Sequence, residues 1–154
     1  LREASRLSGE VSVVREALIL ADHGATSMHD VTRGGILETS IEISRLSGVS
    51  LEIDADLVPS RPIVERFAQA FSFDPVKMIS SGSLVATMAP EKIEEALGAL
   101  QSSGIPAGDV GTVKEGKGIT ICRKGMIGFT ETEIHCEDDE LARMWAIHKE
   151  SRSY

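Results

Sequence analysis

The chain has 154 residues and a formal net charge of −8, and hydrophobic residues make up 42% of it. This length and composition predict one globular domain. The negative charge argues against nucleic acid or an acidic membrane surface as the main partner. Two cysteines are too few for a disulfide framework and favour a reducing cytoplasm. No apolar run approaches ~18 residues, so we expect no membrane span, and the N-terminus carries no signal-peptide pattern.

The chain begins with a polar segment that is followed by a helical pattern. Residues 1–10 are small and polar and predict a linker or a frayed end, so we expect the folded domain to span residues 11–154. Apolar residues recur with helical spacing from Val11 to Ala21, and Gly24 is placed to end that helix. Because the sequence does not begin with Met, we expect it to be part of a longer protein. The positions expected to form the apolar face of this first helix are Val14, Ala17, Leu18 and Ala21.

The stretch from His29 to Gly35 combines polar residues with two glycines, directly before a helical pattern that runs to Leu46. We expect it to be a loop, with Asp30 or Thr32 as the N-cap of the helix that follows. The first N–H groups of a helix have no intrahelical partner, and the helix dipole is positive at that end. We therefore expect an anion to bind at this helix start.

The side chains of this loop suit a phosphate. Arg33 offers a fork of donors and Thr32 a hydroxyl, while Gly34 and Gly35 lack a Cβ and would let a ligand approach the backbone. Asp30 would suit a magnesium ion that bridges phosphates. The alternative is that the loop only caps the helix and that the glycine pair allows close packing.

The rest of the chain alternates between strand and helix patterns, which predicts one layered α+β domain, an α/β/α arrangement with a mixed sheet. The expected elements are a strand at 49–54, a helix at 62–71, a buried strand at 84–88, a helix at 90–100 with Ile93, Ala96, Leu97 and Leu100 on one face, strands at 110–113 and 118–122 around a turn at 114–117, a strand at 126–134 and a helix with an acidic start at 138–140.

The remaining histidines and cysteines include one candidate functional residue. His29 is that candidate, and the alternative for it is a structural hydrogen bond. His23 is expected to cap a helix end, and Cys122 lies in an apolar strand pattern that predicts a core position. A metal site at 133–137, around His135 and Cys136, is disfavoured because neighbouring residues of a strand point to opposite faces.

Taken together, these segments resemble the C-terminal domain of the aminoimidazole ribonucleotide synthetase-like (AIR synthase-related) superfamily. Within it they resemble the hydrogenase maturation factor that makes the cyanide ligand, whose HDxTRGG loop matches residues 28–35. The likeness spans about residues 11–125, and the order of the segments is more specific than any single motif. The segments that carry it are Met28–Gly35, Val49–Asp54, Ser81–Val85, Pro90–Leu100 and Val110–Val113.

The resemblance implies a division of labour between two domains. An N-terminal domain, absent from this chain, would form a homodimer and supply most of the ATP pocket. The C-terminal domain would close over the nucleotide and offer its glycine-containing loops to the phosphates. The implied cofactors are ATP and Mg²⁺, and the implied partners are the N-terminal ATP-binding domain and other maturation proteins. The implied site residues are Asp30, Arg33 and His29 for catalysis, Thr32, Gly34, Gly35 and Gly82 for the cofactor, and Asp30 for magnesium.

The sequence departs from the maturation factor at its end. That factor ends in a tail with a final Cys that carries the reacting group, whereas this sequence ends with residues 148–154 and no Cys among them. An ATP-dependent enzyme that activates the oxygen of another substrate by phosphoryl transfer is therefore an equal expectation. The second hypothesis is a non-catalytic assembly or protein-interaction module that keeps the fold. We expect this chain to be inactive by itself.

Overall fold

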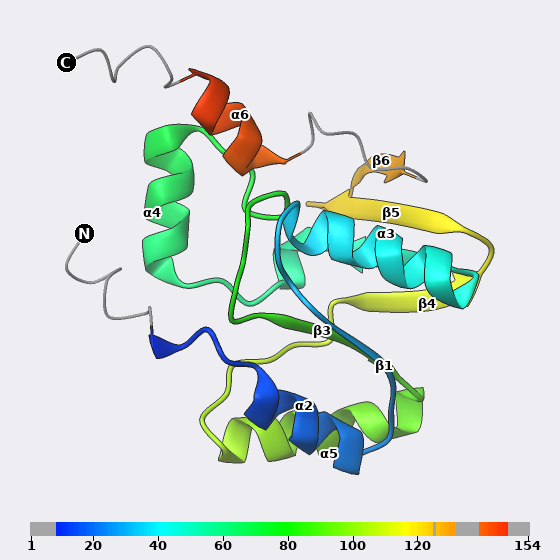
Figure 1. Ribbon diagram of the computed structural model, residues 1–154. Helices are drawn as coiled ribbons and strands as arrows, with labels where there is room; N and C mark the ends of the chain where they lie inside the picture. Colours follow the sequence, from blue (N-terminus) through cyan, green and yellow to red (C-terminus); the bar gives the residue numbers. More distant parts are fainter. Residues whose placement is uncertain (1–8, 125, 132–138, 148–154) are drawn as a thin grey trace.

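The computed structural model describes residues 9–124, 126–131 and 139–147, with side chains for 9–124 and 139–147 (Figure 1). Residues 1–8 of the linker expected at 1–10, and the disfavoured metal site at 133–137, lie outside the described residues. The elements are α2 (Val14–Asp22), β1 (Ala25–Asp30), α3 (Gly35–Ser47), β2 (Val49–Asp54), the short 3₁₀ helix η2 (Ala55–Leu57), α4 (Pro62–Phe71), β3 (Leu84–Met88), α5 (Pro90–Ser102), β4 (Gly111–Glu115), β5 (Gly118–Arg123), β6 (Met126–Glu131) and α6 (Glu140–Ile147).

The larger sheet is mixed, as expected, and has the strand order β4-β2-β5-β6. Strand β2 runs parallel to β5 and antiparallel to β4, and β5 pairs antiparallel with β6. Helix α3 lies over one face of this sheet (Figure 1). Gly48 ends α3 in the left-handed conformation, with φ of 67°, which a glycine adopts without steric cost.

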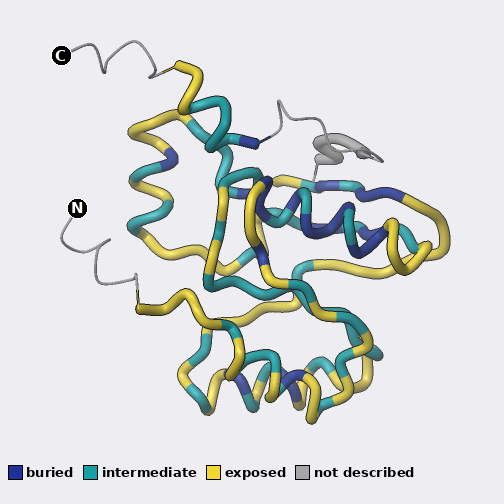
Figure 2. Tube along the Cα trace, in the orientation of Figure 1, coloured by how far each residue is buried: buried dark blue, intermediate teal, exposed yellow. Residues whose placement is uncertain are grey.

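The main core lies between α3 and this sheet. Leu51 and Ile53 of β2 are buried while the residues between them are half-buried, which is the predicted period of two. Figure 2 shows the buried residues gathered along α3 and β5. Full burial of one such aliphatic side chain contributes about 1.5–3 kcal/mol. The buried members of this core are Leu37, Ile41, Ile43, Leu51, Ile53, Val76, Ile119 and Ile121.

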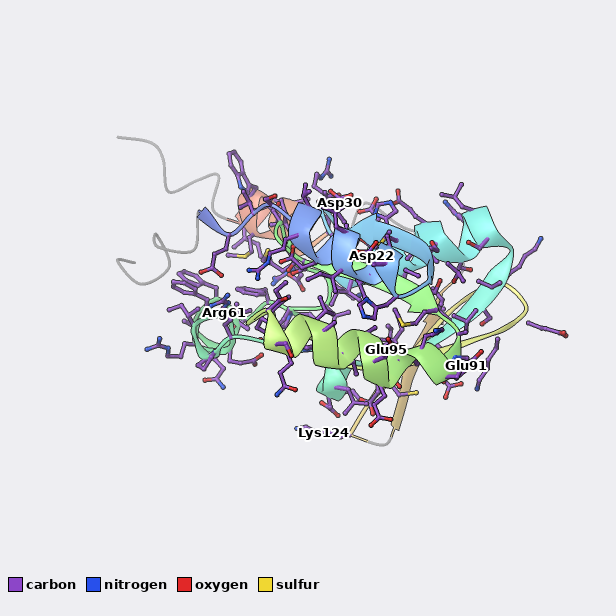
Figure 3. The ribbon with its side chains drawn as sticks, turned by 90° about the horizontal axis from the view of Figure 1, so that it is seen from below. Asp22, Asp30, Arg61, Glu91, Glu95 and Lys124 are labelled. Carbon is purple, nitrogen blue, oxygen red and sulfur yellow. The ribbon has the colours of Figure 1, made fainter. Side chains whose placement is uncertain are left out.

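A second, smaller core lies under an antiparallel ribbon formed by β1 and β3. Helices α2 and α5 pack side by side against it (Figures 1 and 3). The predicted apolar face of α5 is confirmed, since Ala96 and Leu100 are buried there. Strand β3 is half-buried along its length rather than buried.

The predicted apolar face of α2 is wrong, although the helix itself is confirmed. Val14 and Leu18 are each 63% exposed, and the buried residue of this helix is Leu20. The helix carries apolar residues on more than one side, and only the side toward α5 and the ribbon is covered. The spacing of apolar residues along the helix therefore did not predict which side would be buried.

Strands β4 and β5 lie on either side of a short turn, as expected, but they do not pair with each other as the strands of a hairpin would. Strand β2 lies between them and pairs with both. The turn that connects β4 to β5 crosses from one side of β2 to the other, and Gly116 and Gly118 adopt φ of 127° and 85° there. The turn passes over the start of β2, where an added Cβ on Gly116 would lie 3.4 Å from Ser50 Cβ. Lys114 forms an ion pair with Glu52 across the β4–β2 pair.

Cys122 is half-buried and does not lie in the main core. It alternates with Ile119 and Ile121 along β5, so its side chain lies on the sheet face away from α3. The prediction of a core position for Cys122 is therefore wrong. Among the described residues, no helix is long and apolar enough to cross a membrane.

Candidate functional site

The predicted loop begins later than expected, because His29 and Asp30 are the last residues of β1. Pairing with β3 continues to the Asp30–Leu84 position, and the Val31 N–H then donates to the Ser83 carbonyl at 2.9 Å. Strand β1 was not predicted, because it is short and its hydrophobic residues do not alternate with polar ones: Met28 is on the exposed side, and polar Ser27 and His29 are on the less exposed side. The pairing brings the loop after β1 next to the turn that contains Gly82.

Neither Asp30 nor Thr32 caps α3, so that expectation is wrong. The N-cap is Gly34, in the left-handed conformation with φ of 69°, and no side chain caps the helix. The Gly35 N–H points to the Thr32 carbonyl at 3.4 Å, and the Leu37 N–H donates to the Val76 carbonyl at 3.1 Å. Some of the backbone N–H groups at the start of α3, which we expected to bind an anion, therefore already face carbonyl groups of the protein.

The glycines of the site allow close packing, which is the alternative considered for the pair. An added Cβ on Gly35 would lie 2.4 Å from the Val76 carbonyl oxygen, and one on Gly34 would lie 2.0 Å from Glu38 Oε2. At Gly82 it would lie 2.4 Å from the Glu10 carbonyl oxygen. Protein atoms thus fill the space at all three positions, and the loop conformation depends on the absent side chains.

The polar side chains of the loop are presented to solvent. The side chains of Asp30 and Arg33 are 62% and 68% exposed, and Thr32 is exposed beside them. Arg33 Nε donates to Asp139 Oδ2 at 3.1 Å, and the Asp139 side chain is only 6% exposed. Sequence reasoning missed Asp139 as a partner of the loop. Its one signal was the acidic start of the last helix, where the Asp139 carboxylate now caps α6 by accepting from the Leu141 N–H at 3.0 Å.

His29 connects β1 to α3. Its Nε2 lies 2.9 Å from Glu42 Oε2, and its Nδ1 lies 2.7 Å from the Asp30 carbonyl oxygen. Both ring nitrogens therefore face acceptors of the protein, which favours the structural alternative for this residue. His23 is bonded as expected at the end of α2, with Nδ1 2.8 Å from the Ile19 carbonyl oxygen.

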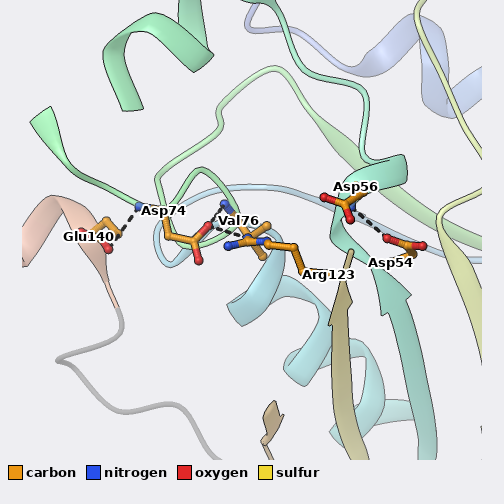
Figure 4. A network of polar contacts seen from close by, with 6 residues as sticks. All are labelled: Asp54, Asp56, Asp74, Val76, Arg123 and Glu140. Atoms are coloured by element: carbon orange, nitrogen blue, oxygen red, sulfur yellow. Dashed lines mark hydrogen bonds and ion pairs between the residues drawn. The ribbon is translucent and has the colours of Figure 1, made fainter. Parts of the chain in front are cut away.

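A polar network joins α6 and β5 to the segment that lies against the start of α3 (Figure 4). Asp74 Oδ1 accepts from Arg123 Nη2 at 2.9 Å and from the Val76 N–H at 3.1 Å. The Asp74 N–H points to Glu140 Oε1 at 3.3 Å. The hydrogen bond that Arg123 donates to the Asp74 carboxylate raises the pKa of Arg123. This network holds Val76 where it contacts Gly35.

Glu38 folds over Gly34 in a crowded acidic environment. Burial raises the pKa of Glu38, the negative charges of Glu42 and Asp139 raise it further, and the positive charge of Arg33 opposes them. A carboxyl group with a raised pKa in the folded state stabilises the fold when protonated. That contribution is complete below its ordinary pKa of 4.5 and is lost as the pH rises through the folded-state pKa.

Glu38→Gln is therefore expected to be more stable than the wild type at pH 7, with a smaller difference at pH values below 4.5. Urea unfolding at pH 7 and pH 3.5 measures both differences. Glu94→Gln removes an exposed carboxylate from α5 and controls for the change in net charge. A Glu38→Gln difference that stays constant across this pH range would contradict the assignment.

The residues of the loop fit a bridging magnesium ion but not a cage formed by the protein. Within the described residues, no group of three or more His, Cys, Asp or Glu side chains could hold a metal ion. The exposed carboxylate of Asp30 could supply one oxygen ligand. Mg²⁺ is commonly bound by one or two carboxylates, with phosphate and water supplying the rest.

The sheet face away from α3 carries a shallow cavity of about 430 Å³. Its lining includes the carboxylates of Glu52, Asp54 and Asp109 together with Cys122. This acidic lining is unfavourable for a phosphate. The loop after β1 therefore remains the candidate site.

Comparison with known proteins assigns the chain to a family. The family model for the C-terminal domain of AIR synthase related proteins matches residues 3–123, so the chain belongs to this family. The chain is 36% identical over 80 residues to carbamoyl dehydratase HypE of Rhizobium leguminosarum bv. viciae, a match that covers 52% of this chain and 23% of that protein. The fold and family expected from the sequence are confirmed.

Solved structures show the same fold. A crystal structure of E. coli HypE aligns with a TM-score of 0.70 at 27% identity, covering 86% of this chain and 41% of that one. The HypE–HypF complex aligns with a TM-score of 0.65 at 25% identity, covering 84% and 41%. HypE in complex with ATP aligns with a TM-score of 0.65 at 22% identity, covering 89% and 41%. The chain thus spans about two fifths of these proteins, and their activities and partners do not transfer to it directly.

Proposed function

We propose that this chain is the C-terminal part of an ATP-dependent enzyme similar to the hydrogenase maturation factor HypE. In this proposal, residues 11–154 close over the phosphates of a nucleotide held by an N-terminal domain. The observation that carries the proposal is the exposed guanidinium of Arg33 beside exposed Thr32 and Asp30, at the junction of two glycine-containing turns. The similarity to a HypE structure with bound ATP supports it.

Each residue has a proposed role. The terminal nitrogens of Arg33 bind phosphate oxygens, the Thr32 hydroxyl donates to them, and Asp30 orients magnesium or water. Gly34, Gly35 and Gly82 shape the loops rather than offering open backbone, since protein atoms fill their Cβ positions. His29 holds the end of β1 against α3 through Glu42.

In these roles, the residues contribute to catalysis by positioning the phosphates and by electrostatic stabilisation. When bound, ATP supplies the phosphoryl group that a substrate oxygen accepts, and ADP leaves. The residues of this chain would hold the phosphates in line and offset their charge. The proposed assembly is a homodimer in the cytoplasm that works with other maturation proteins, and a structure of HypE bound to HypF supports such partners.

The second candidate is a non-catalytic module that keeps the fold for assembly. The filled space at Gly34 and Gly35 favours it, because packing alone accounts for both glycines. The two candidates differ in nucleotide binding.

Arg33→Ala is expected to weaken Mg·ATP binding about tenfold, since it removes charge-assisted hydrogen bonds to phosphate. Isothermal titration calorimetry on the complete protein, as encoded in its gene, measures the change. Arg45→Ala is the matched control, because Arg45 is an exposed arginine in the last turn of α3, at the opposite end of that helix from the loop. Unchanged ATP affinity in Arg33→Ala would reject the proposed role and favour the assembly module.

A further inference from the structure

We propose that Asp139 is a positioning residue for Arg33, so that docking of α6 prepares the phosphate-binding side chain. This inference rests on the proposed function of the loop. Asp139 is 106 residues from Arg33 in the sequence and lies outside the part of the chain that the family model matches. The contact therefore adds a residue that neither the loop motif nor the family match contains.

Asp139 contacts Arg33 at Nε and leaves the two terminal nitrogens of the guanidinium available for a ligand. Asp139 Oδ2 accepts from Arg33 Nε at 3.1 Å, and Nε carries one of the five N–H donors of an arginine. The Arg33 side chain is 68% exposed, whereas the Asp139 side chain is 6% exposed. A buried anchor thus restrains the arginine at Nε while its terminal nitrogens can face a ligand.

The anchor itself is held in place. Asp139 Oδ1 accepts from the Leu141 N–H at 3.0 Å, which ties the carboxylate to the first turn of α6. Helix α6 is held in turn to the segment before β3. The Arg143 Nη2 group donates to the Ser72 carbonyl at 2.7 Å, and the Glu140 N–H points to the Lys77 carbonyl at 3.4 Å. Because both oxygens of Asp139 are used, the arginine has a fixed partner.

The opposite arrangement would be a carboxylate that blocks Arg33 from phosphate. A competing anion would be expected to take the planar fork with two parallel hydrogen bonds, as carboxylates and phosphates commonly do. The contact at Nε favours positioning over blocking. Positioning reduces the conformational freedom that an exposed arginine would lose on binding.

Asp139→Asn tests this inference. Asparagine keeps the capacity to cap α6 but removes the charge that holds Arg33. Calorimetry on the complete protein, with Mg·ATP and with adenosine as probes, compares the wild type, Asp139→Asn, Arg33→Ala and the double variant. Asp22→Asn, at the exposed end of α2, controls for the loss of one negative charge.

Asp139→Asn is expected to bind Mg·ATP about fivefold more weakly, within the range for ordering one long side chain on binding, and to bind adenosine as the wild type does. In the Arg33→Ala background the same change should have no further effect, since the arginine that it positions is gone. A merely structural role of Asp139 would weaken both probes and would persist in that background.

The outcomes separate this inference from the proposed function. If Arg33→Ala leaves ATP binding unchanged, the proposed phosphate role fails, and the positioning role fails with it. If Arg33→Ala weakens binding but Asp139→Asn does not, only the positioning role is overturned. Tighter ATP binding by Asp139→Asn would show that the carboxylate competes with phosphate, which also overturns positioning.

Discussion

Gly35→Ala is expected to lower the free energy of unfolding by about 3 kcal/mol, as the sum of left-handed backbone strain and overpacking. Gly35 has φ of 66°, and an added Cβ would lie 2.4 Å and 2.7 Å from the carbonyl oxygens of Val76 and Met78. These contacts are with backbone, and the Val76 carbonyl also accepts from the Leu37 N–H. Neither side can move without loss of packing at the start of α3. Urea unfolding of both proteins, fitted with a common m-value, measures the difference in the free energy of unfolding.

Gly48→Ala is the matched control for this change. Gly48 has φ of 67°, almost the same as Gly35, but no atom outside its own stretch of chain lies within 4 Å of its Cβ position. It should therefore lose only the backbone term, about 1 kcal/mol. Equal losses in the two variants would contradict the packing role assigned to Gly35.

Ser44→Ala is expected to cost about 2 kcal/mol, because it leaves a buried backbone donor without its partner. Ser44 is fully buried in α3. Its hydroxyl donates to the Val49 carbonyl at 2.6 Å and accepts from the Gly118 N–H at 2.7 Å. One side chain thus ties the end of α3 to the first residues of β2 and β5. Thermal and urea unfolding measure the loss.

Ser40→Ala is the control from the same helix. Ser40 is equally buried, but its hydroxyl donates to the Ile36 carbonyl at 2.6 Å, which also accepts a helical N–H. We expect a loss of less than about 1 kcal/mol, since no buried group is left unpaired. A loss as large as that of Ser44→Ala would show that volume, rather than the link between the strands, sets the cost.

These two positions show how the fold builds the candidate site. Ser44 fixes the far end of α3 to the sheet, and Gly35 fixes its near end to the segment at Val76. Both ends of α3 are thus set before any ligand binds. The exposed side chains of Asp30, Thr32 and Arg33 extend from a backbone that is held next to α3, which would preorganise the proposed phosphate site.

Local patterns were sufficient for most elements. Strand β2 matches its predicted bounds because apolar and polar residues alternate along it. Pro62 and Pro90 each begin a helix, since proline suits the first helical turn. The resemblance identified the domain from the order of such segments, and the family match confirms it.

The errors in the strands concern contacts between distant segments. The split of β4 from β5 depends on β2, which precedes them by about 60 residues, and no property of the turn at 114–117 reveals that insertion. The end of β1 was assigned to a loop because its pairing partner, β3, is far along the chain. The stability of a strand depends on neighbours that are distant in the sequence, so a short stretch of sequence does not predict which strands pair.

The chemistry of the candidate loop, an arginine, a hydroxyl and a carboxylate beside two glycines, follows from residue types alone. Which of these groups are available does not. Tertiary packing fills the space at Gly35, ties Nε2 of His29 to Glu42, and places Asp139 on Arg33, whereas the first turn of α3 itself places Glu38 over Gly34. Residue type determines what a group can bind, whereas burial and partners determine what it is free to bind, and these depend on segments up to 106 residues apart.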